Sequence, residues 1–251
     1  MKKIIFANQK GGVGKTTTCR EIGIYFGSIG KKVLFIDADP QGNLTNGLID
    51  NDGKSGLFDA LTGGEYTFKK VSENIFILSG DNRLTGLSKS LVGEIDAYTR
   101  LKTILEDDRF NVFDYIFIDS RPAFDTLTIN GFTSCTDVII PMSPGEYTLQ
   151  GTNDLLASIA KVKKNFNPLI NITGVIINAY DCRPIITREI KEEIQEVFGD
   201  KLFQTVLSKT IKIEEAISEK VGVIHLKNLD KTRIAEEVTL IGNELLKRLE
   251  G

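Results

Sequence analysis

The feature that most limits the fold is a glycine-rich turn near the start of the chain. It is preceded by residues 3–7, which are mainly apolar and predict a strand, and followed by residues 16–29, which have the apolar spacing of a helix. The turn reads Lys10-Gly-Gly-Val-Gly-Lys15-Thr16-Thr17. A strand that turns through glycines directly into a helix is typical of α/β folds, because the helix packs back onto a parallel sheet.

The same alternation continues along the chain. Short runs rich in β-branched and aromatic residues indicate parallel strands that are buried on both faces. Further strands are expected at residues 32–36, 75–78, 115–118, 138–140 and 172–177, and helices at 96–107, 149–166, 187–198 and 233–249. Residues 41–70 are rich in Gly, Asn, Asp and Thr and predict a surface excursion or a loop-rich insertion. We therefore expect one domain over residues 1–251, an α/β fold with a doubly wound, mostly parallel sheet flanked by helices.

Composition removes several classes of protein. With 41% hydrophobic and 26% charged residues, the chain is not of the disordered or coiled-coil type. No apolar run is long enough for a spanning helix, and three distant cysteines with one histidine disfavour structural zinc and disulfides. A reducing cytosol is the expected compartment. The net charge of −3 excludes a global polycation, so any nucleic acid must bind a local basic patch.

The turn predicts phosphate binding. Glycines let the backbone curl so that its N–H groups surround phosphate oxygens, and the helix N-terminus adds partial positive charge. Lys15 is placed to neutralise the β- and γ-phosphates, and the Thr16 hydroxyl to bind Mg²⁺. The strict pattern GxxxxGKS/T is missed by one residue, because Gln9 replaces the first glycine and is followed by an additional lysine, Lys10. The expected nucleotide-binding residues of the loop are Lys10, Gly11, Gly12, Val13, Gly14, Lys15, Thr16 and Thr17.

Two acidic segments follow predicted strands. Phe35-Ile-Asp37-Ala-Asp39 places two carboxylates at a strand end, and residues 115–118 run into Asp119. Ligands bind at this edge of a parallel sheet. A single Asp after a strand is often only a cap or turn residue, but beside a phosphate loop we expect Asp39 and Asp119 to serve the nucleotide, with Asp37 as a possible metal ligand.

These segments together resemble the deviant Walker A ATPases of the ParA/MinD family, which have the P-loop NTPase fold. The resemblance is closest to the ParA (Soj-like) branch and covers almost the whole chain. It is carried by Lys10-Gly-Gly-Val-Gly-Lys-Thr-Thr17, Asp37-Ala-Asp-Pro-Gln-Gly-Asn43, Phe117-Ile-Asp-Ser120, Leu127-Thr-Ile-Asn130, residues 174–181 (GVIINAYD), residues 198–201 (FGDK) and Glu215-Ala216.

The resemblance implies an ATP- and Mg²⁺-dependent ATPase that forms a nucleotide-sandwich homodimer. Lys10 would reach the partner subunit's phosphates, while Lys15 and Thr16 would serve phosphate and Mg²⁺ within the subunit. It also implies that Asp39 orients the attacking water and that Asp119 holds Mg²⁺ through water. Asn178 resembles the position that contacts the adenine edge.

One departure from the family pattern is Arg121, which replaces the first proline of the usual DxPP sequence. It either contacts the nucleotide, pairs with Asp125, or lies in a solvated loop.

ParA relatives coat DNA without sequence preference, so the resemblance also implies a basic surface and nucleoid association of a cytoplasmic, ATP-bound dimer. Candidates for the DNA contact are Lys209, Lys212, Lys220, Lys227 and Arg233. The alternative for such scattered lysines is a solvated face, because Glu214, Glu215 and Glu219 lie among them. A partner protein of the ParB or centromere-adaptor kind would stimulate hydrolysis during plasmid or chromosome partitioning.

Two other functions stay open. The first is a MinD-like or cargo-positioning ATPase that acts on a membrane or a protein complex. The last helix, residues 235–249, is amphipathic and ends in LLKRL, but its glutamates and lack of aromatic anchors favour packing against the core, so no membrane is expected. The second is a nucleotide-gated regulatory binder with negligible turnover, which the presence of Asp39 disfavours.

Overall fold

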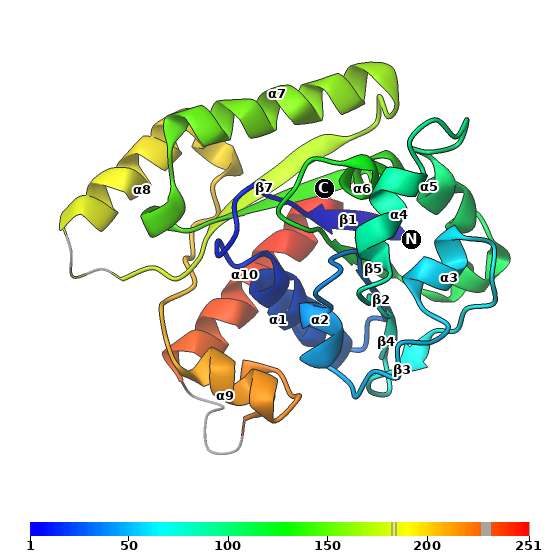
Figure 1. The fold of residues 1–251 in the computed structure, drawn as a ribbon. Coiled ribbons are helices and arrows are strands. Elements are labelled where there is room, and N and C mark those ends of the chain that lie inside the picture. The colour runs from blue at the N-terminus through cyan, green and yellow to red at the C-terminus, as the bar shows by residue number, and fades with distance from the viewer. Residues whose placement is uncertain (182, 184, 227–231, 251) are drawn as a thin grey trace.

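A central sheet with helices on both faces organises the molecule (Figure 1). The structure, a computed structural model, describes residues 1–181, 183, 185–226 and 232–250. Within these residues seven strands form one sheet in the order β3-β4-β2-β5-β1-β6-β7. The strands are β1 (Lys2–Phe6), β2 (Val33–Asp37), β3 (Lys69–Lys70), β4 (Ile75–Leu78), β5 (Tyr115–Asp119), β6 (Asp137–Met142) and β7 (Asn171–Ile177).

All neighbouring strands are parallel except β3, which runs antiparallel to β4 at one edge. The register aligns the strand ends. Phe6 of β1 lies opposite Asp119 of β5, and Asp119 lies opposite Asp37 of β2. The segments that follow β1, β2 and β5 therefore leave the sheet side by side, at the edge where parallel sheets bind ligands.

Helices connect the strands and cover both faces. The α-helices are α1 (Lys15–Ser28), α2 (Asn43–Asn46), α3 (Leu57–Leu61), α4 (Leu84–Ser90), α5 (Arg100–Ile104), α6 (Thr126–Ser134), α7 (Leu149–Asn165), α8 (Ile185–Phe198), α9 (Lys212–Ser218) and α10 (Arg233–Glu250). Short 3-10 helices are η1 (Asp108–Val112), η2 (Pro144–Glu146), η3 (Gly199–Lys201) and η4 (Val223–His225).

Two apolar cores lie on opposite faces of the sheet. Alternate strand residues such as Ile5 and Ile118 face the core that α3 to α8 cover. Their neighbours Phe6 and Phe117 face the core that α1, α2, α9 and α10 cover. Helix α1 lies so close to the sheet that a Cβ at Gly23 would stand 2.2 Å from the Phe35 ring. Both faces of the strands are thus covered, as their continuous apolar sequence predicts.

The predicted fold class is confirmed. Each of the six predicted strands is present within one or two residues of its expected bounds, and so are the helices expected at 16–29, 149–166, 187–198 and 233–249. The final helix packs into the core, as expected. The region 41–70 contains α2, α3 and β3 between loops, and we did not predict these elements, nor α4, α6 and α9.

The prediction of a helix over residues 96–107 is wrong. Only Arg100–Ile104 is helical, as α5. Side chains of α6 take the backbone groups that a longer helix would use. Asn130 accepts a hydrogen bond from Leu101 N at 3.1 Å and donates to Ala97 O, while Thr133 donates to Tyr98 O. Tertiary hydrogen bonds therefore replace the first helical turn.

Asn130 is buried, so its replacement by alanine leaves Leu101 N–H and Ala97 C=O without their partner. We expect Asn130→Ala to lower the free energy of unfolding by about 2–3 kcal/mol. Urea denaturation measures the change. The control is Asn111→Ala, because Asn111 is exposed and its side-chain amide bonds the neighbouring exposed Asp108; its effect should be below about 0.5 kcal/mol. Equal effects of the two substitutions would contradict this role of Asn130.

Candidate functional site

The phosphate-loop residues lie between β1 and the start of α1, at the sheet edge where β2 and β5 also end. Gly12 and Gly14 have φ of 73° and 85°, a left-handed conformation that other residues adopt only with strain. Gly14 is followed directly by the first turn of α1. A curled glycine backbone in front of a helix N-terminus is an anion-binding arrangement.

The two lysines of the loop have different surroundings. Lys15 is buried, and its Nζ donates to Lys10 O at 2.8 Å across the loop. Burial lowers the pKa of Lys15, while the charges of Asp119 and Asp39 oppose that shift. Lys10 extends the other way and its Nζ donates to Glu146 O, in η2 between β6 and α7. Lys15 is therefore held over the loop, and Lys10 is held away from it.

Thr16 and Asp119 meet as the sequence predicts for a cation site. The Thr16 hydroxyl donates to Asp119 Oδ2 at 2.7 Å. Asp119 is fully buried, and its Oδ1 has no hydrogen-bond partner among the described residues. Burial and then the neighbouring charge of Asp37 raise the pKa of Asp119 well above its usual value. An orphaned carboxylate oxygen beside a hydroxyl fits a water or a hydrated cation.

Protein side chains alone do not enclose a metal here. Within the described residues, no three His, Cys, Asp or Glu side chains gather closely enough to hold an ion. A magnesium ion at Thr16 would need phosphate and water oxygens for its remaining ligands, which is how Mg²⁺ commonly binds with nucleotides.

Asp37 and Asp39 differ in what their oxygens contact. Asp37 is fully buried and accepts from Thr45 N at 2.9 Å, Thr45 Oγ1 at 2.7 Å and Asp39 N at 3.2 Å. Burial raises the pKa of Asp37 to about 6. Both of its oxygens already accept hydrogen bonds, so a metal contact would compete with them. Asp39 is half-buried and accepts from Gln41 N at 2.9 Å, which leaves it closer to solvent.

Asn178, which follows β7, lies beneath the phosphate loop. Its Nδ2 donates to Gly14 O at 3.2 Å, and its Oδ1 accepts from Ala179 N at 2.7 Å. The structure therefore brings Asn178 to the loop backbone, and its expected contact with the adenine edge stays a prediction. Arg121 pairs with Asp125, Nη1 to Oδ2 at 2.8 Å, which is one of the three arrangements considered for it. Asp125 also caps α6 by accepting from Thr128 N.

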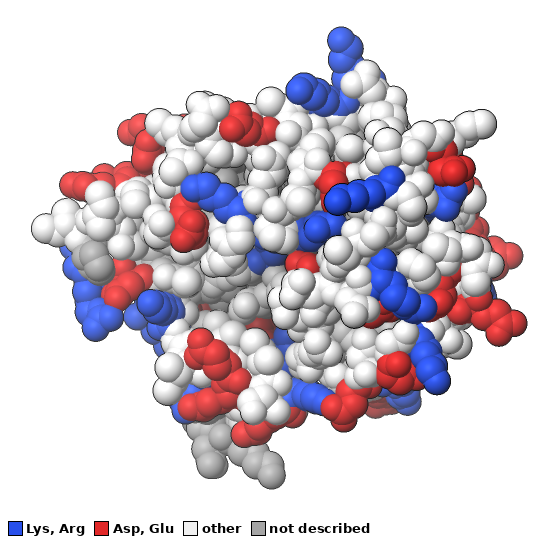
Figure 2. All heavy atoms as spheres, in the orientation of Figure 1, with Lys and Arg blue, Asp and Glu red and all other residues white. Residues whose placement is uncertain are grey.

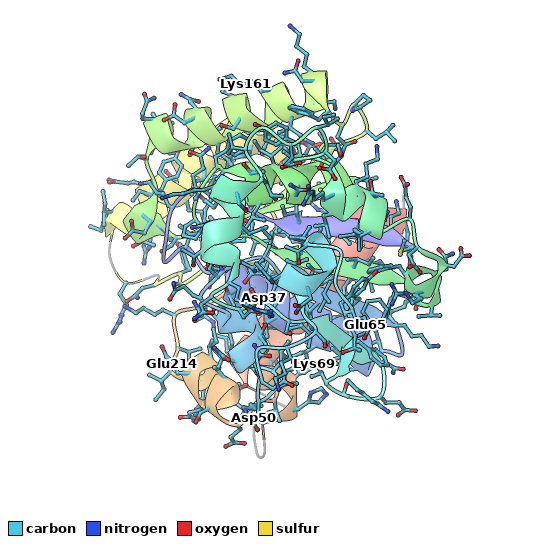
Figure 3. The ribbon with its side chains drawn as sticks, turned by 45° about the vertical axis from the view of Figure 1, so that its right-hand side comes forward. Asp37, Asp50, Glu65, Lys69, Lys161 and Glu214 are labelled. Carbon is cyan, nitrogen blue, oxygen red and sulfur yellow. The ribbon has the colours of Figure 1, made fainter. Side chains whose placement is uncertain are left out.

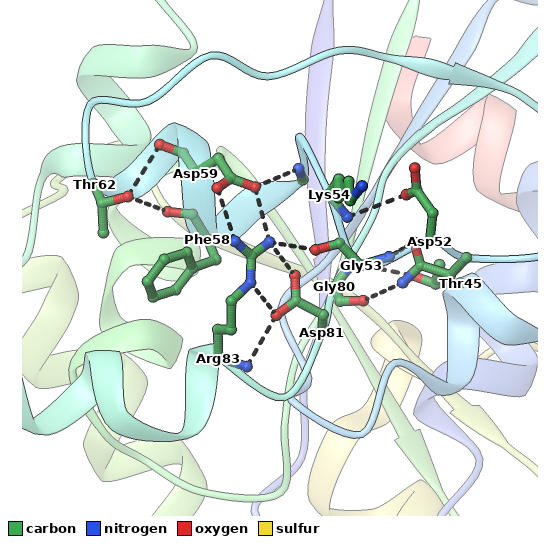
Figure 4. Close-up of polar contacts among 12 residues, drawn as sticks. Thr45, Asp52, Gly53, Lys54, Phe58, Asp59, Thr62, Gly80, Asp81 and Arg83 are labelled. Atoms are coloured by element: carbon green, nitrogen blue, oxygen red, sulfur yellow. Dashed lines mark hydrogen bonds and ion pairs between the residues drawn. The ribbon is translucent and has the colours of Figure 1, made fainter.

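Arg83 is a residue of this region that the sequence analysis missed. Its guanidinium binds the carboxylates of both Asp81 and Asp59, and it donates to Gly53 O at 2.7 Å (Figure 4). This network fastens the segment 53–59 beside Gly80, whose added Cβ would stand 3.0 Å from Asp39 O. The signal in the sequence was Gly80-Asp81, shortly after the predicted strand 75–78. Ser79, rather than Asp81, stands at the position that Asp37 and Asp119 occupy at the ends of their strands.

The basic candidates for DNA contact lie at the surface, but most of them are paired. Lys212 pairs with Glu215 at 2.7 Å, Lys220 with Asp50, and Arg233 with Glu237 at 2.7 Å. Lys209 is exposed, and Lys227 lies outside the described residues. Figure 2 shows acidic and basic side chains interspersed over the face that includes α9. The structure thus places the described candidates at the surface, among acidic neighbours rather than in an extended basic patch on this face.

Gly14 gives a test of the loop geometry. A Cβ at Gly14 would stand 1.4 Å from Asn178 Nδ2, and its φ adds left-handed strain of about 1–2 kcal/mol. We expect Gly14→Ala to lower both the unfolding free energy and nucleotide affinity, and Asn178→Ala in the same chain to restore part of the stability. Calorimetry with and without nucleotide measures both. The control for stability is Gly11→Ala, because a Cβ added at Gly11 would have no other atom within 4 Å. Unchanged stability and nucleotide affinity in Gly14→Ala would contradict this geometry of the loop.

Comparisons with known proteins show the family of this chain. A family model described as an AAA domain matches residues 1–172. The chromosome-partitioning ATPase Soj of Treponema pallidum is 34% identical over 221 residues, which cover 86% of this chain and 87% of that protein. The sporulation initiation inhibitor protein Soj of Bacillus subtilis is 36% identical over 229 residues, with 89% and 90% covered.

Solved structures agree as well. A cobyrinic acid a,c-diamide synthase from Mycobacterium smegmatis, with bound ATP analogue and magnesium, gives a TM-score of 0.87 at 26% identity and covers 100% of this chain and 96% of its own. A plasmid partition protein from Borrelia burgdorferi bound to AMPPNP gives 0.81 at 25%, with 98% and 99% covered. The phosphate loop, the matching family model and the Soj relatives together establish that this chain belongs to the ParA/MinD family of P-loop ATPases, near the Soj branch.

Proposed function

We propose that this protein is a ParA-type ATPase that binds Mg·ATP, forms a nucleotide-sandwich homodimer, binds DNA without sequence preference and drives plasmid or chromosome partitioning by hydrolysis. The observation that supports this most is the loop itself. Lys15 and the Thr16–Asp119 pair lie where β1 and β5 end, and the additional Lys10 opens the same loop. The proposal treats residues 1–251 as one domain, cytoplasmic and nucleoid-associated when ATP is bound.

Each residue of the site has a role in this proposal. The backbone of residues 11–17 cradles the phosphates, and Lys15 exchanges the Lys10 carbonyl for phosphate oxygens. Magnesium bound with ATP would neutralise charge on the β- and γ-phosphates. Thr16 would bind that ion, and Asp119 would hold it through a water molecule. Asp39, half-buried beside the loop, orients the water for in-line attack on the γ-phosphate.

Dimerisation requires a movement of Lys10. Its ammonium now donates to the Glu146 carbonyl, so it must leave that acceptor before it can reach the partner subunit's phosphates. A phosphate group offers a full negative charge in place of a carbonyl dipole, and charge-assisted hydrogen bonds are the stronger ones. Nucleotide held across the dimer therefore favours the exchange.

The proposed DNA binding rests on lysines at the surface, and the proposed dimer has twice as many of them as one subunit. Lys209 is exposed, and Lys212 and Lys220 form surface ion pairs that phosphate groups can replace. Exposed pairs of this kind contribute only about 0–1 kcal/mol each, so their exchange costs little. Arg233 is also at the surface, but its partner Glu237 is buried. Two linked copies of a weak site bind far more tightly than one. A ParB-like or centromere-adaptor protein is the partner we propose for stimulating hydrolysis.

The MinD-like alternative, an ATPase that positions cargo on a membrane or protein complex, has less support. The apolar face of α10, including Ile241 and Leu245, is buried in the core rather than presented to a bilayer. Among the helices of the described residues, none combines the length and apolarity that a bilayer crossing demands. Anionic liposomes are nevertheless tested in parallel with DNA, because the comparison distinguishes a protein that binds DNA from one that binds a membrane.

Substitution of the phosphate lysine and of the acid separates binding from hydrolysis. We expect Lys15→Ala to weaken ATP binding by about 2–4 kcal/mol, roughly 30- to 1000-fold in Kd, because it removes a buried cation from the phosphates. Asp39→Ala should keep ATP binding, lower kcat by about 100-fold or more and accumulate the dimer. Asp52→Ala, at an exposed carboxylate, is the control. Normal hydrolysis by Asp39→Ala would refute the role of Asp39.

A DNA-binding experiment tests whether the protein acts on DNA. We expect random-sequence duplex DNA to bind tightly only with ATP, and the affinity to fall about tenfold or more as salt rises from about 50 to about 200 mM, because phosphate contacts release counterions. Fluorescence anisotropy with ATP, ADP and no nucleotide measures this. The triple variant Lys209→Gln/Lys212→Gln/Lys220→Gln should weaken the dependence of DNA affinity on salt concentration. The control is Lys161→Gln, at an exposed lysine of α7. Binding to liposomes but not to DNA would support the alternative.

A further inference from the structure

One buried guanidinium ties together three segments that are distant in sequence. Arg20 lies on α1, five residues after Lys15, and only 1% of it is exposed. Its Nε and Nη2 both donate to Gly47 O at 3.2 Å, just after α2. Nη2 also donates to Val221 O at 2.6 Å and to Ala216 O at 3.2 Å, in and after α9. Its charge is balanced by Glu21.

The short helix that follows Asp39 is held from two sides, by Asp37 and by Arg20. Helix α2 has only four residues. The Asp37 carboxylate binds Thr45 within it, and Arg20 binds the Gly47 carbonyl at its end. Movement of the Asp39 segment is therefore limited by β2 on one side and by α1 on the other.

The same guanidinium holds α9, which carries Lys212 and is followed by Lys220. Other contacts reinforce the link between the two segments. Glu21 accepts from Val223 N at 2.8 Å, Lys220 pairs with Asp50, and an added Cβ at Gly47 would stand 3.6 Å from Ile217. In Figure 3, Asp50 and Glu214 lie toward the same end of the molecule, which shows α9 beside the loop that follows α2.

We infer that Arg20 is a positioning residue that couples the segment 39–47, which we propose to face the nucleotide, to the segment 212–220, which carries Lys212 and Lys220, and so transmits the nucleotide state to the proposed DNA-binding surface. This inference rests on the proposed function. A buried cation that loses its partners is strongly destabilised, so the carbonyls of Gly47, Ala216 and Val221 must move together with the guanidinium or not at all. A displacement of the Asp39 segment on ATP binding therefore shifts α9.

The test removes the guanidinium without leaving the Glu21 carboxylate as an unpaired buried charge. In Arg20→Met/Glu21→Gln the buried ion pair becomes a neutral pair of similar volume, and the amide oxygen that replaces the Glu21 carboxylate still accepts from Val223 N–H. The matched control is Arg109→Met/Asp107→Asn, which removes an exposed Arg–Asp pair of 3.0 Å. That pair lies in and beside η1, before β5, and thus at the other end of the strands from the phosphate loop.

For wild type and both variants, the Kd for random duplex DNA is measured with and without ATP, together with kcat and KM for ATP. We expect Arg20→Met/Glu21→Gln to keep the KM for ATP within about twofold of the wild-type value, because Lys15 and Thr16 are intact. The ATP-dependent gain in DNA affinity should fall about tenfold, because the guanidinium no longer links the two segments. The control variant should match wild type. An unchanged gain in the double variant would overturn the coupling.

Hydrogen exchange of the wild type tests the same inference without any substitution, even where the double variant does not fold. A non-hydrolysable ATP analogue is added in the absence of DNA. We expect protection to change in residues 39–50 and also in residues 212–223. A change confined to 39–50 overturns the coupling. Absence of DNA binding by the wild type refutes the proposed function instead, and the exchange result still decides whether the two segments are coupled.

Discussion

The site depends on the parallel alignment of β1, β5 and β2. Because Phe6, Asp119 and Asp37 are register partners, the loop before α1 and two carboxylates leave the sheet at one place. Burial of both carboxylates raises their pKa values, and hydrogen bonds from Thr16 and Thr45 offset part of that cost. One acid is thereby fully engaged with α2, while the other keeps an oxygen without a partner among the described residues. The sheet register thus sets a structural carboxylate beside one suited to a hydrated cation.

Local sequence was sufficient for the strands and for the phosphate loop. Strands such as Tyr115–Asp119 are buried on both faces, so their apolar runs are continuous and easily recognised. The prediction of a helix over 96–107 was wrong because Asn130 and Thr133 bind backbone groups that the first turns of that helix would need. Such tertiary hydrogen bonds leave no mark in the apolar periodicity of the segment. Strand β3 has two residues and pairs with β4 at the sheet edge, and so short an element leaves no periodic signal.

The long-range contacts around the site could not be predicted from sequence. Arg83 and Arg20 both bind backbone carbonyls far along the chain, and Arg20 reaches residues almost 200 positions away. A carbonyl group is present at every residue, so no residue type marks it as a partner in the sequence. The motif identified the groups that we propose to face a nucleotide, but not the groups that hold those segments in place.

Under the proposed function, the placement of charge would suit reversible rather than permanent attachment to DNA. The net charge is −3, and Lys212 and Lys220 each have a carboxylate partner at the surface of this structure. One subunit therefore meets DNA with cations that are already paired and with a repulsive background, and its affinity should be low. In the proposed dimer the exchangeable pairs would be doubled, while the solvent-screened cost of breaking each pair would stay small. Affinity would then rise steeply with dimerisation, so nucleotide state would control attachment even though the basic side chains of this segment are interleaved with acidic ones.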